Sequence, residues 1–377
     1  MTRRPFAGVT AFAGAIALGC AETEMPLQGP SRGDCGLPSA HATAGISAQR
    51  PSLTLSADPS AGVAFANGSA FVFDLRDGRI NRVSLRAGHP SHAFGRTGGG
   101  PGEFANYAQS ERLRSYPAQW IDSRHDSVAA FDGKRISFFR SSGEFMHSYS
   151  LPPAISTGFV MVSRIRLSDE AVLVGVYDMG LLPGASQRRF QLFSLTGSTF
   201  RPILAFPLPP LPTSPDGRSF DGSAEAKPQW DLLGRCVVFS DGHSDTLFIA
   251  TTDSREWKRI VMPLPARYRS KDVTNASRLL RIPEGSPRAL PPPSRPMRIY
   301  GLSADPMGWM WLYPVQPSGD FERRKEVWRF DLFSGAFRID TVGAFPVAFD
   351  SAGVGVGIGH NESDEPQLVR VTRPPGG

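Results

Sequence analysis

Short apolar runs, each only a few residues long, alternate with turns along the chain from about residue 51 onward. Within many of these runs the apolar residues occupy every second position, which is the pattern of a strand with one buried face. Glycine, aspartate, asparagine and proline fill the turns between the runs. Because long amphipathic helical patterns are nearly absent, this part of the chain is predicted to be all-β.

The runs fall into groups of four strands, and the groups resemble one another. The clearest copy has strands at 127–132, 135–139 and 144–146, with turns at Gly133 and Gly143. Five further groups show a similar order of runs and turns, at 70–85, 172–204, 236–261, 308–339 and 346–371. Six copies therefore make up the body of the chain.

A four-stranded sheet has two faces to bury, and stacking such sheets around an axis buries both faces and leaves only short edges. We therefore predict a six-bladed β-propeller of four-stranded antiparallel blades. The alternating pattern marks the two outer strands of each blade, and the inner strand is expected to be a run of small apolar residues. A β-sandwich is the structural alternative, but it would not explain the internal similarity.

The two ends of the repeat region are expected to meet. The last copy, 346–371, supplies fewer strands than a full blade, whereas the run 51–55 is a strand candidate without a group. Pairing this run with the last copy would leave the ring without an open edge. The sequence thus predicts a ring closed by an N-terminal strand.

A glycine-rich segment at 94–104, FGRTGGGPGEF, carries a family resemblance. It resembles the signature of the bacterial six-bladed β-propeller lipoproteins, which are related to NHL-repeat proteins. The residues that carry the match are Gly95, Arg96, Gly98, Gly100, Pro101, Gly102, Glu103 and Phe104. The resemblance covers roughly residues 55–375 and implies one propeller domain over 51–377, with residues 263–298 as an inter-blade insertion.

The N-terminus has the pattern of an export signal. Arg3 and Arg4 precede an apolar run, 6–18, that is too short to span a bilayer. The run ends in Ala17-Leu18-Gly19-Cys20, which resembles a bacterial lipobox. Residues 1–20 are therefore predicted to be a lipoprotein-type signal with Cys20 as the lipid attachment site, which implies a protein held at the periplasm or outer membrane. An ordinary signal peptide with a chance cysteine, or an apolar N-terminus that is not exported, remain the alternatives.

Residues 21–50 are rich in Ala, Gly, Ser and Pro without hydrophobic periodicity, so they are predicted to be a flexible tether. Two further cysteines follow Cys20, namely Cys35 in this segment and Cys236 in a strand-like run. An oxidising compartment permits a disulfide between them. A buried free thiol at Cys236 is the alternative that the sequence leaves open.

The net charge of +6 raises the question of nucleic-acid binding. Basic residues are scattered singly, apart from short clusters at 188–189 and 323–325, and form no basic stripe. A mixed solvated surface explains the charge, and no nucleic-acid partner is expected.

The candidate chemical motifs each have a structural explanation. The glycines at 98–102 lack the Lys-Ser/Thr of a phosphate-binding loop, so they are expected to supply backbone angles at a crossing between blades, with Glu103 accepting hydrogen bonds from loop amides. His89 and His92 are three apart in a strand or loop, where such spacing points the rings to opposite faces. The acidic turns 214–218 and 241–245 lack the run of oxygen ligands of a calcium loop, so calcium remains only a possible cofactor.

No nucleophile elbow and no zinc-protease histidine motif occurs in the sequence. Some propeller relatives are calcium-dependent lactonases and lyases, whose ligands are spread over blades and leave no local motif. The chain is thus predicted to be an exported, membrane-anchored binding or scaffold module for a protein or small ligand outside the cytoplasm. A metal-assisted lactonase, lyase or hydrolase with a site in the central funnel is the alternative.

Overall fold

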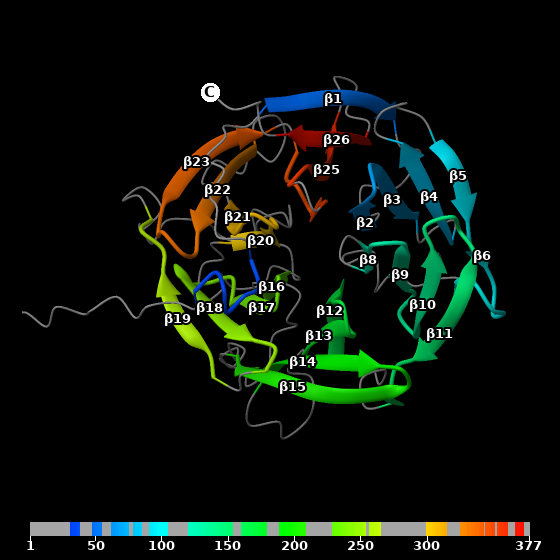
Figure 1. Cartoon of the computed structure of the whole chain (residues 1–377), viewed down its shortest axis with the longest axis horizontal. Helices are drawn as coiled ribbons and strands as arrows, with labels where there is room; N and C mark the ends of the chain where they lie inside the picture. The colour runs from blue at the N-terminus through cyan, green and yellow to red at the C-terminus, as the bar shows by residue number, and fades with distance from the viewer. Residues whose placement is uncertain are drawn as a thin grey trace, which may run out of the picture.

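The computed structural model of the protein describes residues 31–37, 47–54, 62–74, 78–84, 90–104, 120–153, 160–178, 188–208, 228–253, 256–264, 299–314, 325–342, 344–350, 353–360 and 366–372. Their regular elements form six four-stranded antiparallel sheets arranged in a ring, which confirms the predicted six-bladed propeller (Figure 1). The described residues contain no helix that is long and apolar enough to cross a membrane.

Each of the first five blades is a meander in which the chain passes from the channel to the rim. Blade 1 contains β2 (Gly62–Ala66), β3 (Ser69–Asp74), β4 (Arg79–Ser84) and β5 (Pro90–Phe94). Blade 2 contains β8 (Ile121–Arg124), β9 (Ser127–Phe131), β10 (Arg135–Arg140) and β11 (Phe145–Ser150). Blade 3 contains β12 (Val160–Leu167), β13 (Val172–Asp178), β14 (Arg189–Thr196) and β15 (Thr199–Pro207).

The remaining blades follow the same plan until the ring closes. Blade 4 contains β16 (Gln229–Leu233), β17 (Cys236–Ser240), β18 (Thr246–Thr251) and β19 (Lys258–Val261). Blade 5 contains β20 (Ile299–Ala304), β21 (Trp309–Pro314), β22 (Lys325–Asp331) and β23 (Phe337–Val342). Blade 6 contains β24 (Ala348–Phe349), β25 (Gly355–His360) and β26 (Pro366–Thr372).

The fourth strand of blade 6 comes from the other end of the chain. β1 (Ser47–Thr54) pairs antiparallel with β26, and Ser47 lies opposite Thr372. Figure 1 shows β1 on the outside of β26, where it completes the blade. The predicted ring closure by an N-terminal strand is therefore confirmed, and the closing strand begins a few residues earlier than the run 51–55.

Six clusters of buried apolar side chains fill the spaces between neighbouring blades of the described structure. Blades 1 and 2, for example, share a cluster that includes Phe71, Phe73 and Phe139, and blades 3 and 4 share one that includes Phe190 and Phe239. The other four clusters occupy the remaining interfaces. Both faces of every blade are thus buried by stacking, which is the physical reason for the ring.

The inner strands depart from the sequence expectation. β2, with the sequence GVAFA, is the small apolar run that was predicted. β8, β12 and β16 instead carry charged residues toward the channel, so the prediction is wrong for these three strands. The charged residues are Asp122, Arg124, Arg164, Arg166 and Asp231.

Candidate functional site

A cavity of about 490 Å³ lies at one end of the central channel. It is bounded by the ends of the six inner strands, where each strand turns into the second strand of its blade. The lining therefore includes residues of all six blades, among them Phe65, Asp122, Arg166, Asp231, Ala304 and Phe349. A pocket of this size at the axis of a propeller is within the usual range for a small-molecule site, which is about 300–1,000 Å³.

Asp231, at the floor of the cavity, accepts hydrogen bonds from several blades at once. Arg166 on β12 donates from Nη2 to its Oδ2 at 2.9 Å, and Arg164 on the same strand approaches Oδ2 at 2.9 Å. The amide of Ala304 on β20 donates to the same oxygen at 2.9 Å. The side chain of Asp231 is only 2% exposed, so these bonds replace its water.

Arg164 and Arg166 extend this network around the ring. Arg164 donates to the carbonyl oxygens of Trp230 at 2.7 Å and Leu302 at 2.9 Å. Arg166 donates to Asp122 on β8 at 3.0 Å and to the carbonyl oxygen of Val347, just before β24, at 3.3 Å. Two arginines and two aspartates thus connect blades 2 to 6 at the floor of the cavity.

The two aspartates of the network differ in their electrostatics. Burial raises the pKa of Asp122, and the charge of Arg166 opposes that shift without cancelling it. Burial also acts to raise the pKa of Asp231, but Arg166 and Arg164 outweigh it and hold the pKa below its ordinary value. Burial lowers the pKa of Arg164 to about 10, which still leaves it charged at neutral pH. Asp231 is therefore the firmly ionised anchor, and Asp122 is the carboxyl that is less well compensated.

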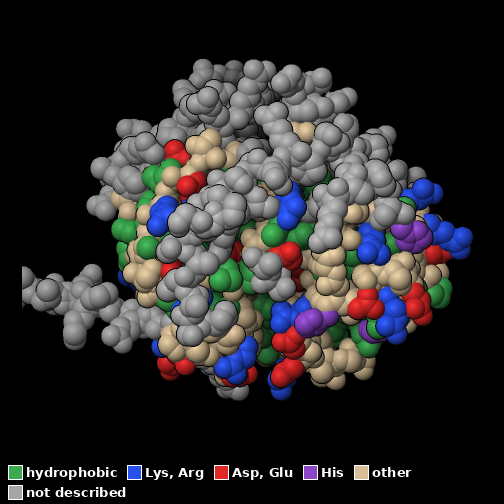
Figure 2. All heavy atoms as spheres, turned by 45° about the horizontal axis from the view of Figure 1, so that its top comes forward, with side chains coloured by type: hydrophobic (Ala, Val, Ile, Leu, Met, Phe, Trp, Pro, Cys, Tyr) green, Lys and Arg blue, Asp and Glu red, His purple; other side chains and the backbone are tan. Residues whose placement is uncertain are grey.

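The rim of the cavity carries a second, exposed ion pair. Arg124, which lines the cavity, donates to the two oxygens of Asp169 at 2.7 and 2.8 Å. His125 lies 3.2 Å from the same carboxylate, and this contact lowers the pKa of Asp169 after the larger effect of Arg124. Figure 2 shows acidic and basic side chains intermixed on the described part of the face in view, without an area of one sign.

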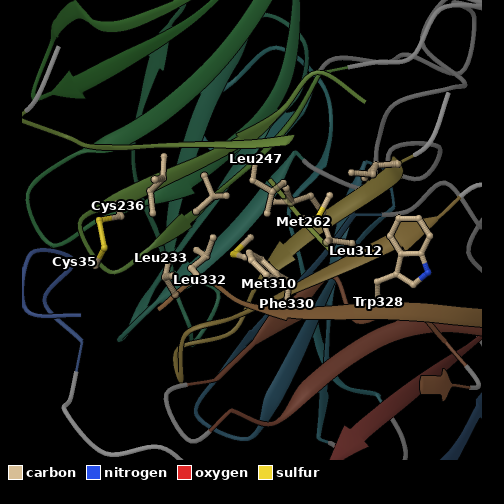
Figure 3. Packing of buried hydrophobic residues seen from close by; sticks show 14 of the residues in the cluster. Cys35, Leu233, Cys236, Leu247, Met262, Met310, Leu312, Trp328, Phe330 and Leu332 are labelled. Carbon is tan, nitrogen blue, oxygen red and sulfur yellow. A yellow bond between two sulfur atoms is a disulfide. The ribbon is translucent and has the colours of Figure 1, made fainter. Parts of the chain in front are cut away.

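The N-terminal turn 31–37 forms one wall of the cavity through Gly36 and Leu37. A disulfide between Cys35 and Cys236, with an S–S distance of 2.03 Å, fixes this turn to β17. The sequence had left this pairing open. Figure 3 shows the bond at the edge of the apolar cluster between blades 4 and 5.

Further contacts hold the turn in place beside the disulfide. The Arg235 amide donates to the Cys35 carbonyl oxygen at 2.9 Å, and a side chain at Gly234 would collide with that oxygen. Arg32 donates to the Met307 carbonyl oxygen at 2.9 Å, and its guanidinium lies 5.1 Å from the ring centre of Phe333. The turn therefore bridges blades 4 and 5 at the mouth of the cavity.

The glycine-rich signature loop lies at the rim of the propeller between blades 1 and 2, and none of its residues lines the cavity. Its strands β6 (Arg96–Thr97) and β7 (Glu103–Phe104) pair in parallel. Glu103 accepts hydrogen bonds from the Gly100 amide and Arg96, each at 2.6 Å, and the Gly100 bond is the main reason that its pKa is lowered. Arg135 of blade 2 donates to the carbonyl oxygens of Gly98, Gly99 and Glu103, so the loop is tied to the next blade.

Backbone conformation and packing also fix the rest of the signature loop in place. Gly95 and Gly102 have φ angles of 78° and 71°, in the left-handed region that favours glycine. Gly102 lies against Phe145, and Phe104 is fully buried against Phe73 and Phe139. Pro101 occupies the turn between the two short strands.

Of the other sequence candidates, those that the structure describes do not line the cavity. Cys20, His89, the turn 214–218 and most of the insertion 263–298 lie outside the described residues, and His92 is exposed on β5. Asp241 uses one oxygen to accept from the amides of His243 and Ser244, as in a tight turn. Within the described ranges, no three His, Cys, Asp or Glu side chains lie together as metal ligands would. The expectation about calcium stays a prediction.

Sequence reasoning missed the four charged residues of the floor. One local signal is the run VMVSRIRL, in which Arg164 and Arg166 fall on the same face of an otherwise apolar strand. Paired arginines at alternate positions of a buried strand require acidic partners, and Asp231 interrupts the apolar run QWDLL. Each signal is weak alone because the partners belong to different blades.

No family model matches the chain, and no curated protein matches it. Among solved structures, a Bacteroides fragilis NCTC 9343 protein that is assigned as exported superposes with a TM-score of 0.50 at 12% identity, over 90% of this chain and 98% of that one. A calcium-binding regucalcin from Agrobacterium tumefaciens C58 gives 0.44 at 10% identity, over 88% and 91%. A luciferin-regenerating enzyme gives 0.46 at 8% identity, over 88% and 98%. The likeness to the Bacteroides fragilis protein shows a shared propeller fold and does not extend to function.

Proposed function

We propose that the protein is an exported, membrane-anchored binding module that takes a small ligand in the cavity at the end of its channel. The observation that carries this proposal is the cavity itself, which residues of all six blades and of the N-terminal turn line. The charged groups on its floor donate to and accept from one another and backbone groups, so their positions are fixed before a ligand binds. A rigid site of this kind is suited to recognition.

The disulfide supports export. Disulfides form and persist in oxidising compartments such as the periplasm and are rare in the cytosol. Cys35 and Cys236 are both fully buried and bonded to each other, which is compatible with that environment. The lipobox-like run ending at Cys20 and the resemblance of residues 94–104 to bacterial lipoproteins point the same way.

Membrane anchoring is tested by a single substitution. In cells that express the full chain, Cys20→Ala should abolish incorporation of a labelled fatty acid and release the protein from the membrane fraction. Cys35→Ala is the matched control, since it also removes one cysteine and should leave acylation unchanged. A Cys20→Ala protein that stays acylated and membrane-bound would contradict the anchor.

Binding in the cavity is tested by filling it. Ala304 lines the cavity, whereas Ala205 is exposed on the outer strand β15. A fragment library screened by ligand-observed NMR against the full chain should give binders. Their binding should be lost in the Ala304→Phe variant and kept in the Ala205→Phe variant. A complete lack of binders sensitive to Ala304→Phe would overturn the proposal.

An enzyme remains the second candidate because of Asp122. A partly exposed carboxyl with a raised pKa on a cavity wall is a typical acid–base group. A screen of the protein, with and without added metal, against lactones, esters, glycosides and peptides addresses this alternative. Turnover that disappears in Asp122→Asn would replace the binding function by catalysis.

A further inference from the structure

We propose that the ligand of the cavity is a neutral polyhydroxylated molecule, such as a sugar or a cyclic polyol. This inference rests on the proposed function, because it names the ligand class of the same cavity. Three properties of the site lead to it: the charge balance of the floor, the hydrogen-bonding capacity that the floor leaves open, and the apolar walls.

The floor is already electrically balanced. Its two arginines and two aspartates carry equal and opposite charges, and they pair with each other at 2.5 to 3.0 Å. The Arg124 side chain on the rim is likewise paired with Asp169. Among the described residues, these floor and rim charges are already paired with one another, so a charged ligand would lose its hydration on entry without gaining a counter-ion from them. The site therefore favours a neutral ligand.

The floor nevertheless keeps an acceptor and a donor open beside each other. Asp122 accepts from Arg166 Nη1 and the Leu167 amide, with a further weaker contact from the Ser123 amide, whereas a carboxylate accepts about four hydrogen bonds. Among the described residues, the partners of Arg166 use Nε, both hydrogens of Nη2 and one of Nη1, which leaves one of its five N–H donors. Both side chains are slightly exposed, 13% for Asp122 and 11% for Arg166, and both line the cavity.

A hydroxyl group matches this arrangement because it donates and accepts at the same atom. Neighbouring hydroxyls on a ring can donate to Asp122 and accept from Arg166, which lie 3.0 Å apart. An amide group separates its donor from its acceptor and fits this close pair less well.

The walls suit the apolar faces of such a ring. Phe65 and Phe349 line the cavity from blades 1 and 6, and Leu37 and Met307 line it from the N-terminal turn and blade 5. Ring C–H groups can pack on these side chains while the hydroxyls face the floor. The volume of about 490 Å³ is compatible with a ligand of one or two sugar rings.

The experiment compares neutral and charged versions of one ring. Binding of glucose, galactose, maltose and myo-inositol to the full chain is measured by saturation-transfer NMR and calorimetry, beside glucosamine, gluconate and short peptides. We expect neutral compounds to bind at least tenfold more tightly than their charged counterparts. Asp122→Asn should weaken binding at least tenfold, and Asp126→Asn, on the adjacent exposed turn, should leave it unchanged.

Two further variants keep the outcomes distinct. Phe349→Leu should weaken binding of neutral rings even if Asp122→Asn folds poorly, and thermal melting checks the fold of each variant. Charged compounds or peptides that bind as tightly, and are displaced by Ala304→Phe, would overturn the ligand class and leave the binding cavity intact. Neutral compounds that bind regardless of Ala304→Phe would also overturn the inference. If nothing of any class binds in the cavity, the proposed function fails with it.

Discussion

The apolar layers join all six sheets of the ring, whereas the charged floor of the channel joins blades 2 to 6, and the two hold the sheets together in different ways. Each layer joins two neighbouring blades, as Phe190 and Phe239 do for blades 3 and 4. The floor instead shares single side chains among several blades, since Arg166 contacts groups of blades 2, 4 and 6. We therefore expect local changes to be tolerated better in the layers than in the floor, where one charge serves several blades.

The largest effect is expected from removing one charge from the floor. Asp231→Ala leaves Arg164 and Arg166 buried without their shared counter-ion, and such a loss costs about 3–5 kcal/mol. Asp169→Ala breaks an arginine pair at the surface, where Asp169 is 66% exposed, and should cost about 0–1 kcal/mol. Denaturant unfolding measures both values. Equal losses in the free energy of unfolding for the two variants would show that burial of an ion pair does not increase its contribution to stability.

Removal of the disulfide should cause the second-largest loss of stability. It links residues 201 positions apart and so restricts the unfolded chain strongly. Its removal by Cys35→Ser with Cys236→Ser should lower the free energy of unfolding by about 2–4 kcal/mol. Unfolding of the wild type with and without a reductant provides the check, and the double variant should not respond to the reductant. An unchanged stability would mean that the contacts of Arg32 and Arg235 hold the turn alone.

A small change in an apolar layer should have a smaller effect. Ile249 is fully buried between blades 4 and 5, and Ile249→Val removes one methylene group at a cost of about 0.5–1.5 kcal/mol. Val261→Ala is the control, since Val261 is 55% exposed and should change stability by less than about 0.5 kcal/mol. A loss above about 3 kcal/mol for Ile249→Val would show that the layers are as intolerant as the floor.

The smallest expected effect is a difference between Asp231 and Asp122 in how each makes stability depend on pH. Asp231 has a lowered pKa in the folded state, so its stabilising contribution is present above the ordinary carboxyl value of 3.8 and is lost as the pH falls through the folded-state value. Asp122 has a raised pKa, so the folded state binds its proton more readily and gains stability as the pH falls toward 3.8.

The two asparagine variants should therefore change the acid profile in opposite directions. Asp122→Asn should lose stability more steeply than the wild type between neutral pH and about pH 4, whereas Asp231→Asn should lose less below that value. Unfolding in urea across this pH range is the measurement. Parallel profiles for both variants would contradict the opposite pKa shifts.

The fold could be predicted from the sequence because its signals are local. The alternation in segments such as 135–139 and the turn glycines Gly133 and Gly143 repeat with every blade. The closure by the N-terminal strand followed from counting strands, because one group lacked a strand and one strand lacked a group. The repeated runs and turns depend on residues close together in the chain, whereas the closure joins its two ends and was found from the strand count.

The floor of the cavity could not be predicted because its partners are distant in sequence. Arg166 is 44 residues from Asp122, 65 from Asp231 and 181 from Val347. The inner strands β8, β12 and β16 each contribute one or two of these charges, and only the closed ring brings them together. The pairing of Cys35 with Cys236 had the same obstacle, since nothing near either cysteine specifies the other.

The position of Cys35 in the chain has a mechanical consequence. Cys35 precedes β1, and its covalent bond leads to β17 in blade 4. A pull on the N-terminal end would therefore enter the folded body at the disulfide and pass into the middle of a blade. β1, which is held to β26 only by hydrogen bonds, follows this crosslink in the chain. A pull on the N-terminal end thus meets a covalent bond to blade 4 before it meets the seam of the ring.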